Sequence, residues 1–265
     1  MCFVELIFEH ATDSSFSCGL LAHCGRGDEY LVASTAHCYK WEAGGAAVMG
    51  SIQPQPLPVQ PDCTMAISDI LDAVKPDDAH YARTRLLALE NTMGGRLLPL
   101  EYLQAAVSAA KGKGLSTHLD GARLFNAAAA QASATASAST LPTPDTALIV
   151  AEAQRIARLF DSVSVCFSKG LGAPVGSCLL GSKDFLYKAH RVRKMAGGGM
   201  RQVGVLAAAA GYALTHNIAR LVNDHDLAAQ LASALSKFPH VEIDGPHTNM
   251  VSVPHASLAS SVCIC

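Results

Sequence analysis

The segment Asp161–Ser177, DSVSVCFSKGLGAPVGS, constrains the fold more than any other part of the chain. A run rich in β-branched and small residues leads to a single lysine, Lys169, and glycines follow closely. This order is typical of a strand that ends in a tight turn. A lysine at a strand end between apolar groups loses hydration, which disfavours its ammonium form and lets the amine attack a carbonyl. The segment therefore predicts a strand that delivers a reactive lysine to the edge of a sheet.

A second strand-like run, LSTHLDGARLFN at 115–126, ends in Asp120 just before a glycine. The carboxyl ends of strands in an open α/β sheet form the ligand crevice, so we expect Asp120 and Lys169 to face one bound molecule. Pyridoxal phosphate needs a lysine for its aldehyde and an acid for its ring nitrogen. A lone turn lysine or a lone Asp-Gly pair is typical of an ordinary loop. The two together, each after a strand-like run, favour a cofactor site.

Both segments resemble signature segments of the threonine aldolases, which are pyridoxal-phosphate enzymes of the aspartate-aminotransferase fold type. The resemblance extends from about residue 20 to about residue 253 and is poorer in an Ala/Ser-rich stretch between them. Further matching segments are LAHCGRGDEY (21–30), the stretch 37–45, SIQPQPL (51–57), LENT (89–92) and RKMAGGGMRQ (193–202).

The resemblance implies a role for each of four residues. Lys169 would join the cofactor aldehyde covalently, and Asp120 would pair with the pyridine nitrogen. His37 matches the histidine that stacks on the cofactor ring, where a flat imidazole can also relay protons near neutral pH. Arg123 would lie near the phenolic oxygen and the substrate carboxylate. Ser168, next to Lys169, is a fifth candidate, as a stray donor to the phosphate. We therefore predict Lys169 and His37 as catalytic residues, all five as cofactor-binding residues, and no metal site.

The activity implied by the resemblance is cleavage of threonine or allo-threonine to glycine and acetaldehyde by a carbon-carbon lyase, a step of threonine catabolism and glycine biosynthesis. The family assembles with active sites at subunit contacts, so a homo-oligomer, a dimer or a tetramer, is also implied. A racemase or a β-eliminating lyase of the same fold type is an alternative, because a lysine and an aspartate define the cofactor and not the reaction.

Three departures from the family favour another alternative, a truncated chain with weak or no activity. Residues 1–18 contain no Gly-Thr-Met-type phosphate loop. The arginine with which the family's small domain clamps the substrate carboxylate would fall beyond Cys265. Met93 stands where the family usually has a histidine near the substrate hydroxyl. From these we expect weak binding of pyridoxal phosphate and slow cleavage of threonine.

Strand-like runs alternate with helical ones along the chain, which predicts an α/β fold. We expect an aspartate-aminotransferase-like large domain with a mostly parallel sheet at 1–213, with an insertion at 127–146 that is helical only in its alanines. A linker helix and an incomplete small α/β domain follow at 214–265. The expected helices are 99–110 and 147–159, and the segment 203–235 is expected to form one helix or two, broken or bent near residues 223–224. The expected late strands are 241–245 and 248–253.

Composition narrows the class of protein further. With 265 residues, half of them apolar, the chain can bury a sizeable core. A formal net charge of −2 gives no sign of a nucleic-acid or membrane partner. The resemblance implies a small amino acid as the substrate. The first ten residues lack the basic start of a signal peptide and no apolar run could span a bilayer, so we expect a cytoplasmic enzyme. The nine cysteines lack zinc-like spacing, and Cys166 and Cys178 are expected to be reduced and buried.

Overall fold

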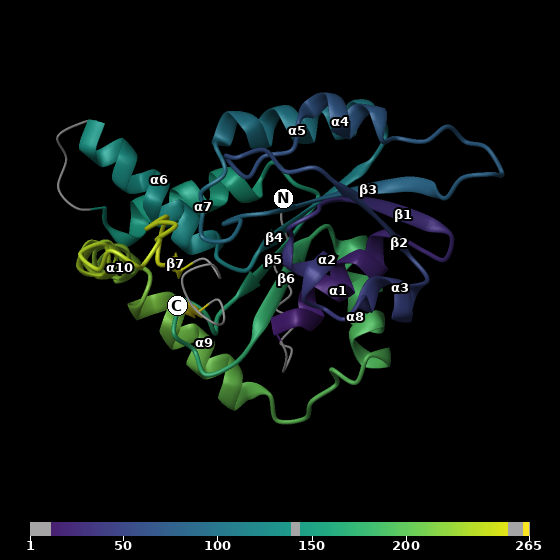
Figure 1. The fold of residues 1–265 in the computed structure, drawn as a ribbon. Coiled ribbons are helices and arrows are strands. Elements are labelled where there is room, and N and C mark those ends of the chain that lie inside the picture. The colour runs from purple at the N-terminus through teal and green to yellow at the C-terminus, as the bar shows by residue number, and fades with distance from the viewer. Residues whose placement is uncertain (1–11, 139–143, 254–261, 265) are drawn as a thin grey trace.

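A six-stranded sheet forms the centre of the molecule in a computed structural model, which describes the backbone of residues 12–138, 144–253 and 262–264. The strand order is β2-β1-β3-β4-β5-β6 (Figure 1). The first five strands are parallel, and β6 runs antiparallel to β5. The predicted α/β class with a mostly parallel sheet is therefore confirmed. The strands are β1 (Asp28–Ala33), β2 (Gln53–Leu57), β3 (Arg83–Glu90), β4 (Ser116–Gly121), β5 (Ser162–Cys166) and β6 (Ser177–Gly181).

Helices cover both faces of this sheet, with α4 and α5 on one side and α1, α3 and α8 on the other (Figure 1). A parallel sheet covered on both faces needs strands that are apolar on both faces. Accordingly, Leu31, Leu87 and Leu119 are fully buried in three adjacent strands. The helices are α1 (Thr12–His23), α2 (His37–Lys40), α3 (Gly45–Gly50), α4 (Ile67–Asp72), α5 (Leu100–Gly112), α6 (Leu124–Ala138), α7 (Thr146–Ala157), α8 (Lys183–Met195), α9 (Gly204–His216) and α10 (Leu221–Leu235).

The predicted insertion at 127–146 is wrong in part, because α6 continues through its Ser/Thr-containing half to Ala138. Buried alanines recur at helical spacing, including Ala132 and Ala136, and the helix packs against α7. The hydroxyl of Thr135 donates to the carbonyl of Gln131 at 3.0 Å and needs no partner outside the helix. These alanines form a buried helix face, which the low-complexity composition of the segment does not indicate. Residues 139–143 of the predicted insertion lie outside the described residues.

The break in the predicted helix 203–235 lies earlier than expected. Helix α9 ends at His216 and α10 begins at Leu221, so residues 223–224 are inside the first turn of α10. The side-chain amide of Asn217 donates to the carbonyl of Leu171 at 2.7 Å, and Ile218 is buried. A tertiary contact with the loop that carries Lys169 therefore decides where the chain turns.

The C-terminal part forms a second small sheet, in which β7 (Val251–Val253) pairs antiparallel with β8 (Val262–Ile264). The predicted strand 248–253 is present in its second half. The predicted strand 241–245 is wrong, because of its residues only Asp244 makes a bridge, to Ser252. Ala228, Ala232 and Val251 form a hydrophobic cluster of their own next to this sheet. The domain boundary after residue 213 falls inside α9 and stays a prediction.

Several other sequence-based expectations concern single segments. The predicted helices 99–110 and 147–159 correspond to α5 and α7. Cys166 and Cys178 are buried, as predicted. Residues 14–19, the part of the N-terminal region nearest to the expected position of a phosphate loop, belong to α1.

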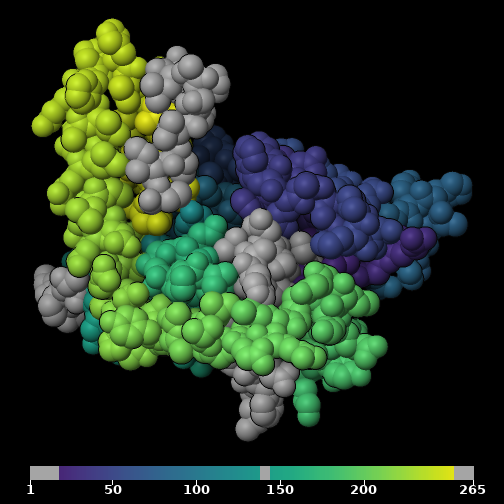
Figure 2. All heavy atoms as spheres, turned by 90° about the horizontal axis from the view of Figure 1, so that it is seen from below, coloured from purple at the N-terminus to yellow at the C-terminus, as the bar shows by residue number. Residues whose placement is uncertain are grey.

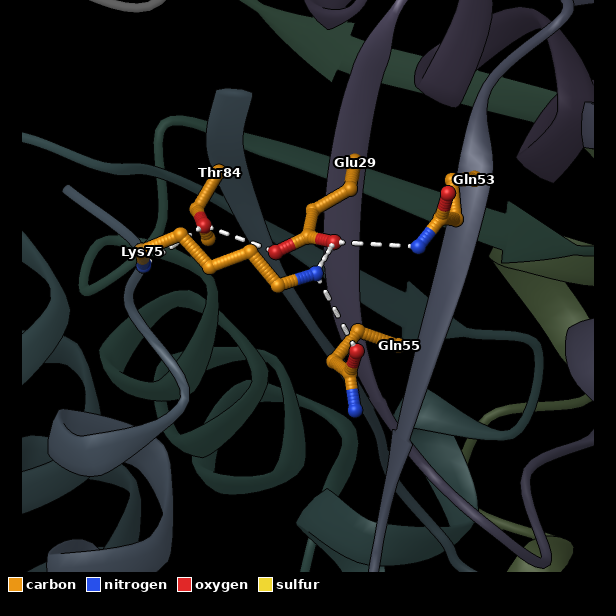
Figure 3. Close-up of polar contacts among 5 residues, drawn as sticks. All are labelled: Glu29, Gln53, Gln55, Lys75 and Thr84. Atoms are coloured by element: carbon orange, nitrogen blue, oxygen red, sulfur yellow. Dashed lines mark hydrogen bonds and ion pairs between the residues drawn. The ribbon is translucent and has the colours of Figure 1, made fainter. Parts of the chain in front are cut away.

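A buried ion pair lies near the amino-terminal edge of the sheet, where Glu29 is fully buried on β1 (Figure 3). Gln53 and Thr84 are its register partners on β2 and β3. The Glu29 carboxylate pairs with the ammonium of Lys75 and accepts hydrogen bonds from the Thr84 hydroxyl at 2.8 Å and the Gln53 amide at 3.5 Å. Lys75 also donates to the side-chain oxygen of Gln55 at 3.3 Å. Both carboxylate oxygens of Glu29 thus have partners.

Candidate active site

The opposite, carboxyl edge of the sheet gathers the residues that the sequence singled out. Glu90 and Asp120 are register partners at the ends of β3 and β4, and Asp120 pairs in register with Ser164 on β5. Lys169 follows the end of β5, and His37 follows the end of β1. The parallel arrangement brings these four strand ends to one edge, where open α/β sheets bind ligands.

Asp120 is buried with 6% of its surface exposed, and its Oδ1 accepts a hydrogen bond from the Ala122 amide at 3.0 Å. Burial raises the pKa of this carboxyl above its ordinary value. The Ala122 N–H and the nearby charges of His37, Lys169 and Arg123 oppose that rise. The structure thus brings together four of the five predicted site residues, with Asp120 at their centre.

Glu90 is a further member of this group, and no sequence pattern predicted a role for it. Its Oε2 accepts a hydrogen bond from the backbone N–H of His37 at 2.8 Å. Burial, and then the negative charge of Asp120, raise the pKa of Glu90 to about 8, against the His37 N–H and the charges of Arg123 and Lys169. The segment 89–92 carried the only sequence signal for this residue, as one of the family-like segments.

The loop that carries Lys169 connects the antiparallel strands β5 and β6. Backbone hydrogen bonds within the loop and packing against α6 both fix its position. The Ala173 amide donates to the Phe167 carbonyl at 2.9 Å, and the Gly172 amide donates to the Lys169 carbonyl at 2.8 Å. A Cβ at Gly170 would lie 2.7 Å from the Asn126 side-chain oxygen, so a larger residue would require Asn126 or the loop to shift. The glycine after the lysine therefore permits close packing behind it.

A cavity of about 660 Å³ opens beside Lys169. Three predicted site residues line it, and the remaining lining residues come mainly from α10 and the segment around β7, which sequence reasoning treated as a linker and a partial domain. Asp120 and His37 are absent from the described part of its lining. The lining residues are Arg123, Ser168, Lys169, Gly170, Asp224, Leu227, Ala228, Leu231, Asn249 and Val251.

Within the described residues the structure contains neither a metal-binding cluster nor a membrane-spanning helix. No cluster of three or more histidine, cysteine, aspartate or glutamate side chains there could hold a metal ion. Among the helices of residues 12–138 and 144–253, none has the length and apolar character needed to cross a membrane.

A family model described as beta-eliminating lyase matches residues 7–257. This chain belongs to that family. The family is one of pyridoxal-phosphate-dependent enzymes. The match includes the five predicted site residues and Glu90.

Curated relatives and solved structures agree with this membership. A low-specificity L-threonine aldolase of Escherichia coli O157:H7 is 47% identical over 234 residues, which cover 88% of this chain and 65% of the relative. An alanine racemase, TOXG of Cochliobolus carbonum, is 36% identical over 78% of this chain and 46% of its own length. The chain thus spans about two thirds or less of these relatives.

Among solved structures, the threonine aldolase of Leishmania major superposes with a TM-score of 0.74 at 21% identity, covering 93% of this chain and 68% of that one. An aspartate aminotransferase of Thermotoga maritima gives a TM-score of 0.62 at 14% identity, covering 92% of this chain and 59% of that one. These likenesses establish the predicted aspartate-aminotransferase-like fold.

Proposed function

We propose that this family member uses pyridoxal phosphate to cleave threonine or allo-threonine to glycine and acetaldehyde. The observation that carries the proposal is the position of Lys169 on the wall of the cavity, with the buried carboxyl of Asp120 near it at a neighbouring strand end. The names of two relatives, both low-specificity L-threonine aldolases, support this reaction over others of the family.

The residues of the site fit the chemistry of this cofactor. A buried carboxyl whose pKa is raised by burial would gain from a cationic ring N–H, which supplies both a donor and an opposite charge. Lys169 offers a primary amine at a cavity large enough for a small cofactor and an amino acid. Arg123 and Ser168 add a guanidinium and a hydroxyl to the same wall, which suit anionic groups.

Each residue then has a defined task. Lys169 would hold the cofactor through its Nζ, Asp120 would keep the ring nitrogen protonated, and His37 would pack on the ring face. Arg123 would bind the substrate carboxylate, and Ser168 would donate to the phosphate. When bound, pyridoxal phosphate supplies an electron sink for the pair of electrons left at Cα when the Cα–Cβ bond of the amino acid breaks. The β-hydroxyl loses its proton as acetaldehyde forms, and Cα gains a proton to give glycine.

We further propose that the chain forms a homo-oligomer. Large apolar side chains are exposed on α8 and α9, namely Tyr187, Met195, Val205 and Tyr212. Figure 2 shows the segment from α8 to α9, in green and yellow-green, across the face nearest the viewer. Exposed apolar surface of this kind is typical of a protein–protein contact. Size-exclusion chromatography with light scattering would give the oligomeric state.

Racemisation of an amino acid is a second candidate, favoured by the similarity to an alanine racemase. Both reactions use the same lysine and carboxylate but break different bonds at Cα, so their products separate them. Incubation with L-threonine should release glycine and acetaldehyde, whereas a racemase would interconvert L- and D-alanine without release of glycine.

Borohydride trapping tests the site itself. The purified chain is incubated with pyridoxal phosphate, reduced with borohydride and digested, and the modified peptide is identified by mass spectrometry. We expect the pyridoxyl group on Lys169 and its loss in Lys169→Ala. Lys183→Ala, at an exposed position on α8, is the matched control and should trap normally. A pyridoxyl group at another lysine in Lys169→Ala would contradict the assignment.

A further inference from the structure

Glu90 links two strand ends of the site. It is the last residue of β3, and its side chain reaches the backbone N–H of His37, 53 residues earlier in the chain, where α2 begins after β1. The 2.8 Å bond fixes the start of α2 against β3. His37, a predicted site residue, therefore takes its position from a side chain on another strand.

Glu90 is also the neighbour of a second acid. Its register partner across β3 and β4 is Asp120, and the Asn91 amide donates to the Asp120 carbonyl at 2.9 Å, so the two strand ends cannot move apart without loss of that bond. Asp120 is buried and Glu90 is half-buried. The negative charge of Asp120 disfavours ionisation of Glu90, because two like charges in a site shielded from water repel each other. The titratable and charged groups that face Glu90 are Asp120 on β4, His37 and Cys38 on α2, Cys63 before α4, Arg123 after β4 and Lys169 after β5.

We propose that Glu90 is a positioning residue that stays protonated, so that it anchors the His37 backbone as a neutral acid and leaves the single negative charge of the pair to Asp120. This rests on the proposed function, in which the anionic Asp120 faces the cofactor ring. A carboxylic acid keeps a carbonyl oxygen that accepts from an N–H, so the bond to His37 does not require an ionised Glu90. Glu90 thus serves the site without contact with the substrate.

The electrostatics of the site agree with this division of charge. Burial and the Asp120 charge raise the pKa of Glu90 to about 8. The cations near Asp120 act in the other direction on that residue, since His37, Lys169 and Arg123 all favour its ionised form. A bound ring N–H would add a further positive partner for Asp120.

The sign of the resulting pH dependence follows from linkage. The ordinary value for a glutamate is 4.5, so between pH 4.5 and about 8 the folded protein holds a proton at Glu90 that the unfolded chain has released. Stability from this group is fully present below pH 4.5 and is lost as the pH rises through about 8. Glu90→Gln keeps the size and the acceptor oxygen of the neutral acid but cannot ionise.

The decisive experiment compares unfolding of the apoprotein and of Glu90→Gln between pH 5 and pH 9. We expect Glu90→Gln to become more stable relative to the parent as the pH rises to about 8. The ratio of the two unfolding equilibrium constants should change by up to about tenfold per pH unit, and it should stay constant above pH 8. Glu101→Gln, on the exposed face of α5, is the matched control and should show no such gain. Parallel curves for Glu90→Gln and the parent would overturn the proposal.

A second measurement does not depend on the stability of any variant. Carboxyl carbon NMR of the parent apoprotein with labelled glutamate should show one resonance that titrates near pH 8, while an ordinary glutamate has finished titrating well below pH 7. A glutamate spectrum fully ionised at pH 6.5 would also overturn the proposal.

The anchoring role has its own test. Glu90→Leu removes the acceptor for the His37 N–H, and we expect about tenfold weaker binding of pyridoxal phosphate than in Glu90→Gln, with Lys169 still the trapped residue. Equal affinity of the two variants would show that the bond to His37 does not position the site. If the parent traps no cofactor at Lys169, the proposed function fails, while the apoprotein titrations still decide the protonation of Glu90.

Discussion

The carboxyl side chains at the two edges of the sheet have opposite kinds of surroundings. At the amino edge, Glu29 has a lysine, a hydroxyl and an amide around its two oxygens (Figure 3). At the carboxyl edge, Glu90 and Asp120 lie side by side, and burial raises the pKa of each. A carboxylate with a full set of partners is suited to hold strands together. A pair with raised pKa values is held ready for a ligand that supplies a positive charge.

Loss of the charge at Asp120 should have the largest effect. Asp120→Asn cannot stabilise a protonated ring nitrogen, and an opposite charge nearby is worth about 1–3 pKa units, so we expect turnover to fall by about 10- to 1000-fold. The apoprotein should be at least as stable as the parent, because one buried charge is gone. Steady-state release of glycine and urea unfolding of the apoprotein measure the two effects. Near-normal turnover with bound cofactor would show that Asp120 has only a structural role in the turn after β4.

Loss of the Lys75 charge should have the opposite effect to Asp120→Asn. It should lower the free energy of unfolding and leave turnover unchanged. Lys75→Met leaves the Glu29 carboxylate buried without its cation, and we expect a loss of about 3 kcal/mol in the free energy of unfolding at pH 7. Lys111→Met is the control, because its pair with Asp161, at 3.3 Å, is solvent-exposed and should contribute less than about 1 kcal/mol. Equal losses in the two variants would contradict the distinction between the edges.

A pair of histidines, the half-buried His23 and the fully buried His118, extends the comparison to groups that stay uncharged. The ring nitrogens of His23 and His118 lie 2.6 and 2.7 Å from the Ser162 hydroxyl. Burial, aided by Lys188 and opposed by Asp161, lowers the pKa of His23 from 6.5 to about 4. Between these two pH values His23 is protonated in the unfolded chain and neutral in the folded protein. The free energy of unfolding therefore falls as the pH drops from 6.5 toward 4.

We expect that acid-dependent loss at His23 to reach about 2 kcal/mol, the smallest of the three effects. Urea unfolding at pH 7 and pH 4.5 measures it, and His23→Gln should lose less between the two pH values than the parent does. An identical acid loss in the variant would assign the sensitivity to other groups.

Much of the fold could be predicted because its signals are local. The apolar run before Lys169, the helix 99–110 and the run ending at Asp120 each specify an element from a few adjacent residues. The extent of α6 was missed because its buried face consists of alanines, which give a weak hydrophobic pattern. The end of α9 was missed because a contact of Asn217 with a distant loop, and no local breaker, sets it.

The sequence by itself determined which chemical groups stand at the ends of the strands, and hence Asp120 and Lys169 as candidates for one site. Only the tertiary structure decided which other groups meet them. Glu90 reaches His37 across 53 residues and Glu29 reaches Lys75 across 46, and neither pairing follows from a local pattern. The physical reason is that strand order and register decide which side chains become neighbours, and burial among those neighbours decides which of them carry charge.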